Sequence, residues 1–364
     1  MQQLKKLLMI GGIAAAAVGV MAGQALANPP SGTTPGHTDV VGVGSDTTQG
    51  VVNQFSTDYN TSHTPKLYSF DATGGGNITP KADCTAIARP NGSGGGISAL
   101  SQNARPAGDA TDFCVDYARS SRGFQTGDAA GLIWVAYGED AVTWSASSTT
   151  NAPATLTPAQ LKAIYSCNDS ALGGSGNPVT WNEVGGTGTA AVVPVIPQSS
   201  SGTRSFFLGQ IGNPTLGSCV LGQDNSVEEN EGTNAVFTGA NSANVVSPYS
   251  VAVYLAQTEH GHGAGDQGSL TLHNVNGNSP TAGTAPNATI NPDFDFVRLV
   301  YNVLRGTGSD PANLTVPSYL QGIFGSGAGT GWLCTDATAQ ADLSSFGFLS
   351  LADNCGTIFQ EGDF

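Results

Sequence analysis

The chain has 364 residues, of which 50 are glycine and only 11% are charged, and its formal net charge is −15 at pH 7. An acidic surface repels nucleic acid and anionic membranes, so both are excluded as partners. The length is more than one hydrophobic core usually serves, which favours two domains.

The first 27 residues have the three parts of a secretory signal. Lys5 and Lys6 precede an uncharged apolar run from Leu7 to Met21, and Ala25-Leu-Ala27 supplies a small-x-small cleavage site. The run is shorter than the roughly 20 residues of a membrane-spanning helix. We expect a signal peptide over 1–27, cleavage after Ala27, a flexible leader over 28–38 and secretion. No cysteine lies at the cleavage site, so neither a lipid anchor nor direct membrane insertion is expected.

The cysteine count is even, which in an exported chain favours disulfide bonds over free thiols. The six cysteines are Cys84, Cys114, Cys167, Cys219, Cys334 and Cys355. Many connectivities are possible, and pairing in chain order is our hypothesis because it closes modest loops. No CxxC or CxxH spacing occurs, so no metal site is expected, and nothing calls for another cofactor.

Buried strands and amphipathic helices alternate along the first third of the chain. Residues 39–44 predict a strand, and apolar residues at helical spacing predict a helix over 48–59. A glycine-rich loop at 92–96 precedes a short helix, and residues 113–118 predict a strand that leads into a polar loop at 119–123.

The same succession of strand, turn and helix is predicted further along the chain. Thr157 is a good N-cap, and Pro158 suits the first turn of a helix. Residues 191–196, 198–202 and 204–211 predict a strand, a turn and a helix. Strands alternating with helices indicate an α/β fold with mixed sheets flanked by helices. The polar stretches 171–188 and 258–286 are expected to be surface loops, and the acidic run 228–231 a solvated face.

Three of the predicted turns contain hydroxyls and free backbone amides at the start of a helix, the usual arrangement for holding an anion. They are Gly44 to Thr47, Gly92 to Gly96 and Ser199 to Thr203. Arg119 and Arg122 lie in the polar loop after a predicted strand, and either could fork two N–H groups onto an oxyanion. The alternative is that each arginine pairs with one of the 27 carboxylates.

An enzyme remains possible at this point. Ser45 or Ser201 would be the nucleophile, with a base among the five histidines, and Glu259-His260-Gly-His262 is their one cluster. Neither serine lies in a Gly-x-Ser-x-Gly elbow, so we predict no catalytic residue and no enzyme. A secreted phosphatase-like hydrolase is the alternative.

Five motifs occur in an order that resembles the phosphate-binding proteins of bacterial ABC importers, a branch of the type II periplasmic-binding-protein fold. The motifs are Gly42-Val-Gly-Ser-Asp-Thr47, Asn91-Gly-Ser-Gly-Gly-Gly-Ile97, Asp116-Tyr-Ala-Arg-Ser-Ser121, Leu156-Thr-Pro-Ala-Gln-Leu-Lys-Ala-Ile-Tyr165 and Ser201-Gly-Thr-Arg-Ser-Phe-Phe207. The resemblance covers most of residues 39–256, and the Ser-Gly-Thr turn is its most specific element.

The resemblance implies two α/β lobes with a ligand cleft between them, namely residues 39–138 plus 250–364, and residues 139–249. It implies an oxyanion, phosphate first, as ligand, and a possible ABC importer as partner of a monomeric protein. Carried over by motif, the binding residues are Asp46, Thr47, Ser93, Ser121, Ser201, Gly202 and Thr203. A surface protein that keeps the fold for another ligand is a further alternative.

Two positions depart from the pattern of this family. The family has an arginine where this chain has Pro197, and it has an aspartate where this chain has Ser121. That aspartate accepts the proton of hydrogen phosphate, which sulfate lacks. The hypothesis is that Arg119 or Arg122 supplies the positive charge and that Asp46 accepts the proton.

Overall fold

The computed structural model describes residues 28–30 and 32–364. The predicted signal peptide and its cleavage site after Ala27 lie outside the described residues. Within the described part of the chain, no helix is both long enough and apolar enough to cross a membrane.

Helices and strands alternate through most of the chain. The helices are α1 (Gln49–Ser62), α2 (Gly92–Ser101), α3 (Pro158–Tyr165), α4 (Gly202–Gln210), α5 (Ala235–Thr238), α6 (Val251–Thr258), α7 (Gln321–Phe324), α8 (Trp332–Thr335) and α9 (Ala337–Ser345). The strands are β1 (Val40–Gly44), β2 (Leu67–Ser69), β3 (Asn77–Ile78), β4 (Ile87–Ala88), β5 (Tyr117–Ser120), β6 (Leu132–Ser147), β7 (Thr155–Leu156), β8 (Val193–Pro194), β9 (Val245–Ser250), β10 (Leu270–Leu272), β11 (Asn274–Val275), β12 (Thr281–Ala282), β13 (Thr289–Ile290), β14 (Val297–Arg305) and β15 (Ile358–Phe359).

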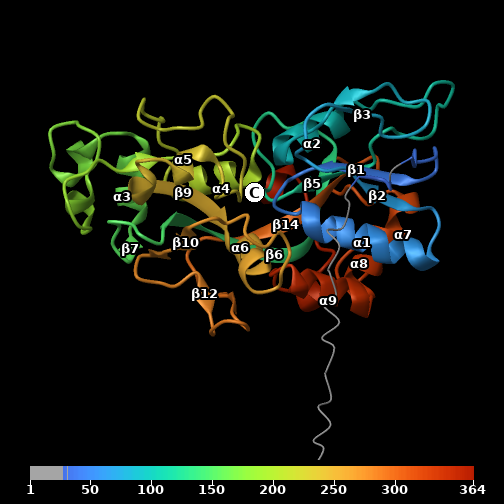
Figure 1. The fold of residues 1–364 in the computed structure, drawn as a ribbon. Coiled ribbons are helices and arrows are strands. Elements are labelled where there is room, and N and C mark those ends of the chain that lie inside the picture. Colours follow the sequence, from blue (N-terminus) through green and yellow to red (C-terminus); the bar gives the residue numbers. More distant parts are fainter. Residues whose placement is uncertain (1–27, 31) are drawn as a thin grey trace, which may run out of the picture.

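A mixed sheet runs through two lobes, in the order β2-β1-β5-β14-β6-β9-β8 (Figure 1). Strand β1 pairs in parallel with β2 and β5, whereas β14 pairs antiparallel with β5 and β6. The long strand β6 pairs with β14 from Leu132 to Ala141 and with β9 from Val142 to Ser145. One strand therefore belongs to the sheet of both lobes, and the predicted α/β class with mixed sheets flanked by helices is confirmed.

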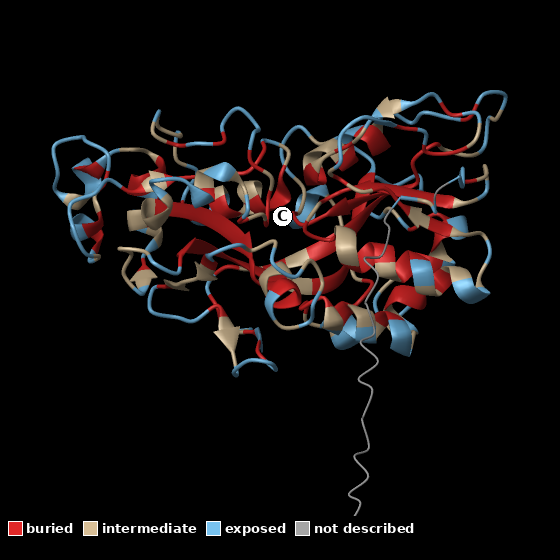
Figure 2. Cartoon of the chain, viewed as in Figure 1, coloured by how far each residue is buried: buried red, intermediate tan, exposed pale blue. Residues whose placement is uncertain are grey.

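The sheet is the best-buried part of the molecule, and its strands are almost uniformly buried in Figure 2. All five residues of β1 are buried, and β6 is buried along nearly its whole length. Burying apolar surface supplies the main favourable free energy of folding, at about 25 cal/mol per Å². The ends of these strands are consequently fixed, and so are the turns that follow them.

Local sequence signals place several helices where we expect them. Thr157 caps α3 with a full capping box to Gln160, and Pro158 is in its first turn. Two elements differ from the prediction in ways that affect the site. Strand β5 extends to Ser120 and so includes Arg119, and α2 begins at Gly92, inside the glycine-rich stretch.

The three disulfide bonds follow chain order, as hypothesised: Cys84–Cys114, Cys167–Cys219 and Cys334–Cys355. The expectation that 171–188 and 258–286 are surface loops is only partly correct. Trp181 and Val275 within them are fully buried, because both join the main hydrophobic core.

Candidate functional site

Three hydroxyl-bearing turns from separate parts of the chain meet at one point. Ser93 is in the first turn of α2, Ser121 directly follows β5, and Ser201 is the N-cap of α4. The backbone N–H of Ser121 donates to Ser93 Oγ over 3.0 Å, and the Oγ atoms of these two serines are 3.4 Å apart. A Cβ added to Gly202 would lie 2.4 Å from each of those oxygens. Only glycine allows the Ser-Gly-Thr turn to approach this closely.

The turn after β1 completes the group. Ser45 Oγ donates to Ser121 Oγ over 3.2 Å, and the hydroxyls of Thr47 and Thr203 are 3.0 Å apart. Thr47 and Thr203 are both buried. The fold thus brings together the three predicted anion-binding turns and the polar loop after β5, although the hydroxyls that meet are up to 156 residues apart.

Backbone amides at the N-terminal ends of α1 and α4 lie in this group. Thr203 lies in the first turn of α4, and Thr47 precedes the N-cap of α1. Amides at the first turn of a helix are not used by the helix itself, and the helix dipole adds a partial positive charge there. We refer to Thr47, Ser93, Ser121, Ser201 and Thr203, together with Arg298 described below, as the donor cluster.

Neither arginine expected from the sequence joins the donor cluster. Arg119 is fully buried, and its guanidinium donates to the carbonyls of Gly44, Ser45 and Phe70 and to Ser69 Oγ. This happens because β5 includes Arg119, so the side chain braces the turn after β1 from behind.

Arg122 is committed elsewhere as well. Its guanidinium forms a bidentate pair with Asp128, with distances of 2.7 and 2.9 Å, and also donates to Gly123 O. Arg122 therefore follows the alternative given in the sequence analysis, in which the arginine pairs with a carboxylate instead of an oxyanion.

The arginine that reaches the donor cluster is Arg298 on β14. Its Nη1 donates to Ser121 O over 2.9 Å, and its Nη2 donates to Thr203 Oγ1 over 3.0 Å. A buried ion pair of 2.7 Å with Asp140 on β6 holds the guanidinium in place. The sequence analysis missed Arg298. The signal for it was a single charge within the apolar stretch 296–301.

A carboxylate also lies in the donor cluster. Glu229 Oε2 accepts from Ser201 Oγ over 2.6 Å and from Thr203 N over 3.3 Å, and Oε1 accepts from Thr47 N over 3.4 Å. Glu229 is 1% exposed, so the expectation that the acidic run 228–231 is a solvated face is wrong. The run folds back into the space between the lobes because its oxygens find donors there.

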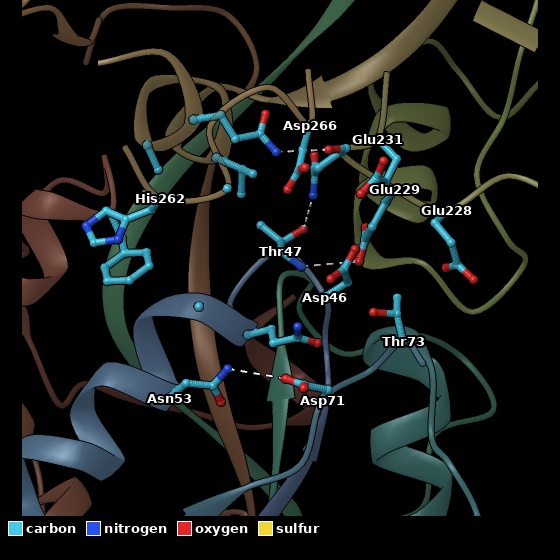
Figure 3. Close-up of a pocket in the computed structure, with 18 of the residues that line it drawn as sticks. Asp46, Thr47, Asn53, Asp71, Thr73, Glu228, Glu229, Glu231, His262 and Asp266 are labelled. Carbon is cyan, nitrogen blue, oxygen red and sulfur yellow. Dashed lines mark hydrogen bonds between the residues drawn. The ribbon is translucent and has the colours of Figure 1, made fainter. Parts of the chain in front are cut away.

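Beside the donor cluster is a cavity of about 740 Å³ with the opposite character. Its carboxylates come from both lobes, and the described residues that line it include no lysine or arginine (Figure 3). These carboxylates belong to Asp46, Asp71, Glu228, Glu229, Glu231 and Asp266. We call this space the acidic cavity, and Glu229 lies on its border with the donor cluster.

Asp46, the expected proton acceptor, lines the acidic cavity. Burial, followed by the negative charges of Glu229 and Glu228, raises its pKa well above the ordinary value of an aspartate. The main-chain atoms of the same turn still position Thr47 in the donor cluster, since Asp46 O accepts from Gln49 N.

Comparison with known proteins agrees with this architecture. A family model described as a PBP superfamily domain matches residues 29–286, and the chain belongs to this family. No curated protein matches the sequence. The two-lobe fold and the family expected from the motifs are therefore confirmed.

Solved structures with the same fold include transport proteins. One, from Clostridium perfringens, is described as a phosphate ABC transporter substrate-binding protein with bound phosphate; it is 17% identical, with a TM-score of 0.54, over 86% of this chain and 99% of that one. Another is an ABC-type phosphate transport receptor from Vibrio cholerae, 17% identical, with a TM-score of 0.52, over 85% of this chain and 99% of that one. At such identities the likeness concerns the fold.

Proposed function

We propose that the protein is a secreted solute-binding protein that captures an inorganic oxyanion, with phosphate as the preferred ligand. The observation that supports this most is the convergence of four hydroxyl-bearing turns and one arginine between the lobes. Hydroxyls, first-turn amides and a guanidinium are the groups that bind phosphate oxygens best, because each donates hydrogen bonds and the last carries a positive charge.

In this proposal the ligand takes hydrogen bonds from Ser93, Ser121 and Ser201 and from the amides of Thr47, Gly202 and Thr203. Arg298, rather than Arg119 or Arg122, supplies the positive charge. In its ionised form, Asp46 accepts the hydrogen bond from hydrogen phosphate once the ligand lies against the turn after β1. The residue set follows from the motifs, and the distances within the donor cluster support it.

The lobe boundaries, the export route and the partner belong to the same proposal. In this proposal the lobes are residues 39–138 plus 250–364, and residues 139–249. The signal peptide is removed after Ala27, the mature protein is a monomer, and an ABC importer accepts the ligand from it.

We assign no catalytic role to Ser45 or Ser201. Neither serine donates to a histidine among the described residues, since Ser45 Oγ donates to Ser121 and Ser201 Oγ to Glu229, while His262 stacks on Phe346 and His273 on Trp144. A serine nucleophile needs a base to take its proton. Purified protein should release no phosphate from phosphate esters with or without zinc, and turnover lost on Ser201→Ala would favour a hydrolase.

Calorimetry on purified mature protein tests the proposal. Phosphate should bind and sulfate should bind more weakly, because only hydrogen phosphate offers a proton to a carboxylate. Asp46→Asn should weaken phosphate and leave sulfate unchanged. The proposal fails if phosphate gives no binding heat, or if sulfate binds as tightly.

A matched pair of α2 variants locates the ligand. Ser93→Ala should weaken phosphate by about tenfold, since a hydrogen bond to a charged group contributes about 1.5–3 kcal/mol. Ser101→Ala is the control, because its hydroxyl donates to Ile97 O at the other end of the helix. Equal effects of the two variants would place the ligand elsewhere.

A further inference from the structure

Glu229 makes the contacts that a bound oxyanion would make. Both of its carboxylate oxygens accept hydrogen bonds, Oε2 from Ser201 and Thr203 in one lobe and Oε1 from Thr47 in the other. The carboxylate therefore bridges the two lobes as a ligand in the cleft would. Figure 3 shows it beside Thr47 and Asp46.

We propose that Glu229 is an internal anion that occupies the oxyanion site of this protein, and that an incoming ligand must displace it. The inference rests on the proposed function and adds the residue that sets the affinity of that site. Glu229 acts as a competitor built into the chain.

The Glu229 carboxylate and an oxyanion cannot occupy the site together, because the donors have too few hydrogens for both. The hydroxyl of Ser201 has one hydrogen, and each backbone amide has one. Ser201 gives its hydrogen to Glu229 over 2.6 Å, the shortest of the three contacts. While Glu229 is in place, a phosphate oxygen cannot receive these three hydrogen bonds, so the ligand has to take them over.

Hydrogen bonds from the donor cluster compensate the burial of the Glu229 carboxylate. It is 1% exposed, and among the described residues no lysine, arginine or histidine lies within ion-pair distance of it. A buried charge without a partner is costly unless hydrogen bonds compensate it. Here helix N-termini and a hydroxyl do so, and these are the means by which an oxyanion would be held.

The acidic cavity beside Glu229 can accommodate its side chain after displacement. Its side chain already borders the acidic cavity of about 740 Å³, and residues 222–234 that carry it contain no helix or strand. Both flanking residues anchor the segment: Glu228 accepts from Asn91 Nδ2 over 2.9 Å, and Asn230 donates to Thr47 Oγ1 over 3.2 Å. Side-chain rotation of Glu229 therefore suffices, without loss of the segment's fixed points.

Displacement has an electrostatic cost that lowers affinity. In the acidic cavity the displaced Glu229 carboxylate would lie among other carboxylates, including those of Glu228 and Glu231, and like charges at close range repel. Removing the Glu229 charge should therefore strengthen ligand binding, both by freeing the donors and by removing this repulsion.

The test compares Glu229→Gln and Glu229→Ala with Glu231→Gln by phosphate calorimetry at physiological ionic strength. Glu231 lines the same cavity, but its carboxylate accepts from Thr233 and contacts none of the three donors. Both Glu229 variants should bind phosphate at least about tenfold tighter than the wild type, as expected when a competing charge-assisted contact is removed. Glu231→Gln should change the affinity by less than about threefold, since it alters only an unpaired, screened charge.

Amide hydrogen exchange without ligand gives a second readout. The amides of Thr47 and Thr203 should exchange faster in Glu229→Ala than in Glu231→Gln, because only the former removes their acceptor. The circular dichroism spectrum checks that each variant is folded.

The outcomes separate the two proposals. If the wild type binds phosphate and neither Glu229 variant binds it more tightly, the internal competitor is overturned and the proposed function stands. Phosphate binding that is lost in Glu229→Gln would instead make Glu229 an acceptor of the ligand's proton, and it would equally overturn the competitor. If no variant and no wild-type protein binds phosphate or sulfate, the proposed function falls, and the inference falls with it.

Discussion

The donor cluster and the acidic cavity lie side by side between the lobes, and they have opposite electrostatic character. In the donor cluster, hydroxyls, first-turn amides and Arg298 all present hydrogens. In the acidic cavity, six carboxylates present oxygens, and its described lining includes no lysine or arginine. Because both regions belong to one chain with a net charge of −15, the net charge does not decide which ligand a site attracts. Local donors and helix ends decide it within a few ångströms.

Glu229 stands between the two regions and explains how they coexist. A carboxylate on the border of the acidic cavity is the nearest anion available to the donor cluster, and the cluster holds it.

Arg298→Met should cause the largest loss of stability. It removes one partner of the buried pair with Asp140 and leaves that carboxylate buried, which typically costs about 3–5 kcal/mol. It should also abolish measurable phosphate binding, since no other guanidinium reaches the donor cluster among the described residues. Urea unfolding and calorimetry measure the two effects. A stability loss below about 1 kcal/mol would mean that Asp140 is compensated without Arg298.

Gly202→Ala should have an intermediate effect on the donor cluster. The added methyl would lie 2.4 Å from both Ser93 Oγ and Ser121 Oγ, so the turns must separate. Overpacking of this kind costs about 1–3 kcal/mol. Gly209→Ala on the same helix is the control, because a Cβ there meets nothing within 4 Å, and it should stabilise by up to about 1 kcal/mol. Similar melting temperatures for the two variants would contradict the close approach.

Asp46→Asn probes the acidic cavity and should have the smallest effect on stability. The pKa of Asp46 is raised in the folded protein, by burial first and then by Glu229 and Glu228. Between the unfolded pKa, about 3.9 for an aspartate, and the raised value, the folded state binds more protons than the unfolded state. Stability from this group is thus greatest at low pH and is lost as pH rises through the folded pKa.

Asp46→Asn should accordingly raise the free energy of unfolding at pH 7 and flatten its fall as the pH rises above the ordinary pKa of an aspartate. Unfolding by urea at several pH values measures both quantities. Asp293→Asn, which removes the same charge from an exposed loop, is the control. If the two variants share one pH profile, Asp46 does not sense the acidic cavity.

The positions of the turns could be predicted from the sequence because they depend on local signals. Thr157 and Ser201 cap their helices through bonds to residues three positions ahead, and such patterns are legible in the chain itself. Disulfide pairing in chain order was a hypothesis of the same local kind, and it is correct. Ser93, Ser121 and Thr203 consequently lie together as the motifs implied.

The charged residues of the site could not be predicted in this way. Arg298 and Asp140 are 158 residues apart, and Thr47 and Glu229 are 182 apart, so only the strand order and the folding back of residues 228–231 bring them together. Arg119 illustrates the converse. The sequence places it in a loop, but β5 extends to Ser120, and the buried guanidinium became a structural brace. Hydroxyl turns are local features, whereas the pairing of a charge depends on the whole fold.

The measurement that tests the account most directly is a phosphate titration followed at the amides of Thr47 and Thr203 by NMR. Both resonances should shift together and saturate at one phosphate per protein, with sulfate producing a weaker response. The account is contradicted if phosphate leaves both amides unmoved up to millimolar concentrations, or if binding saturates while the shifts are confined to other parts of the chain.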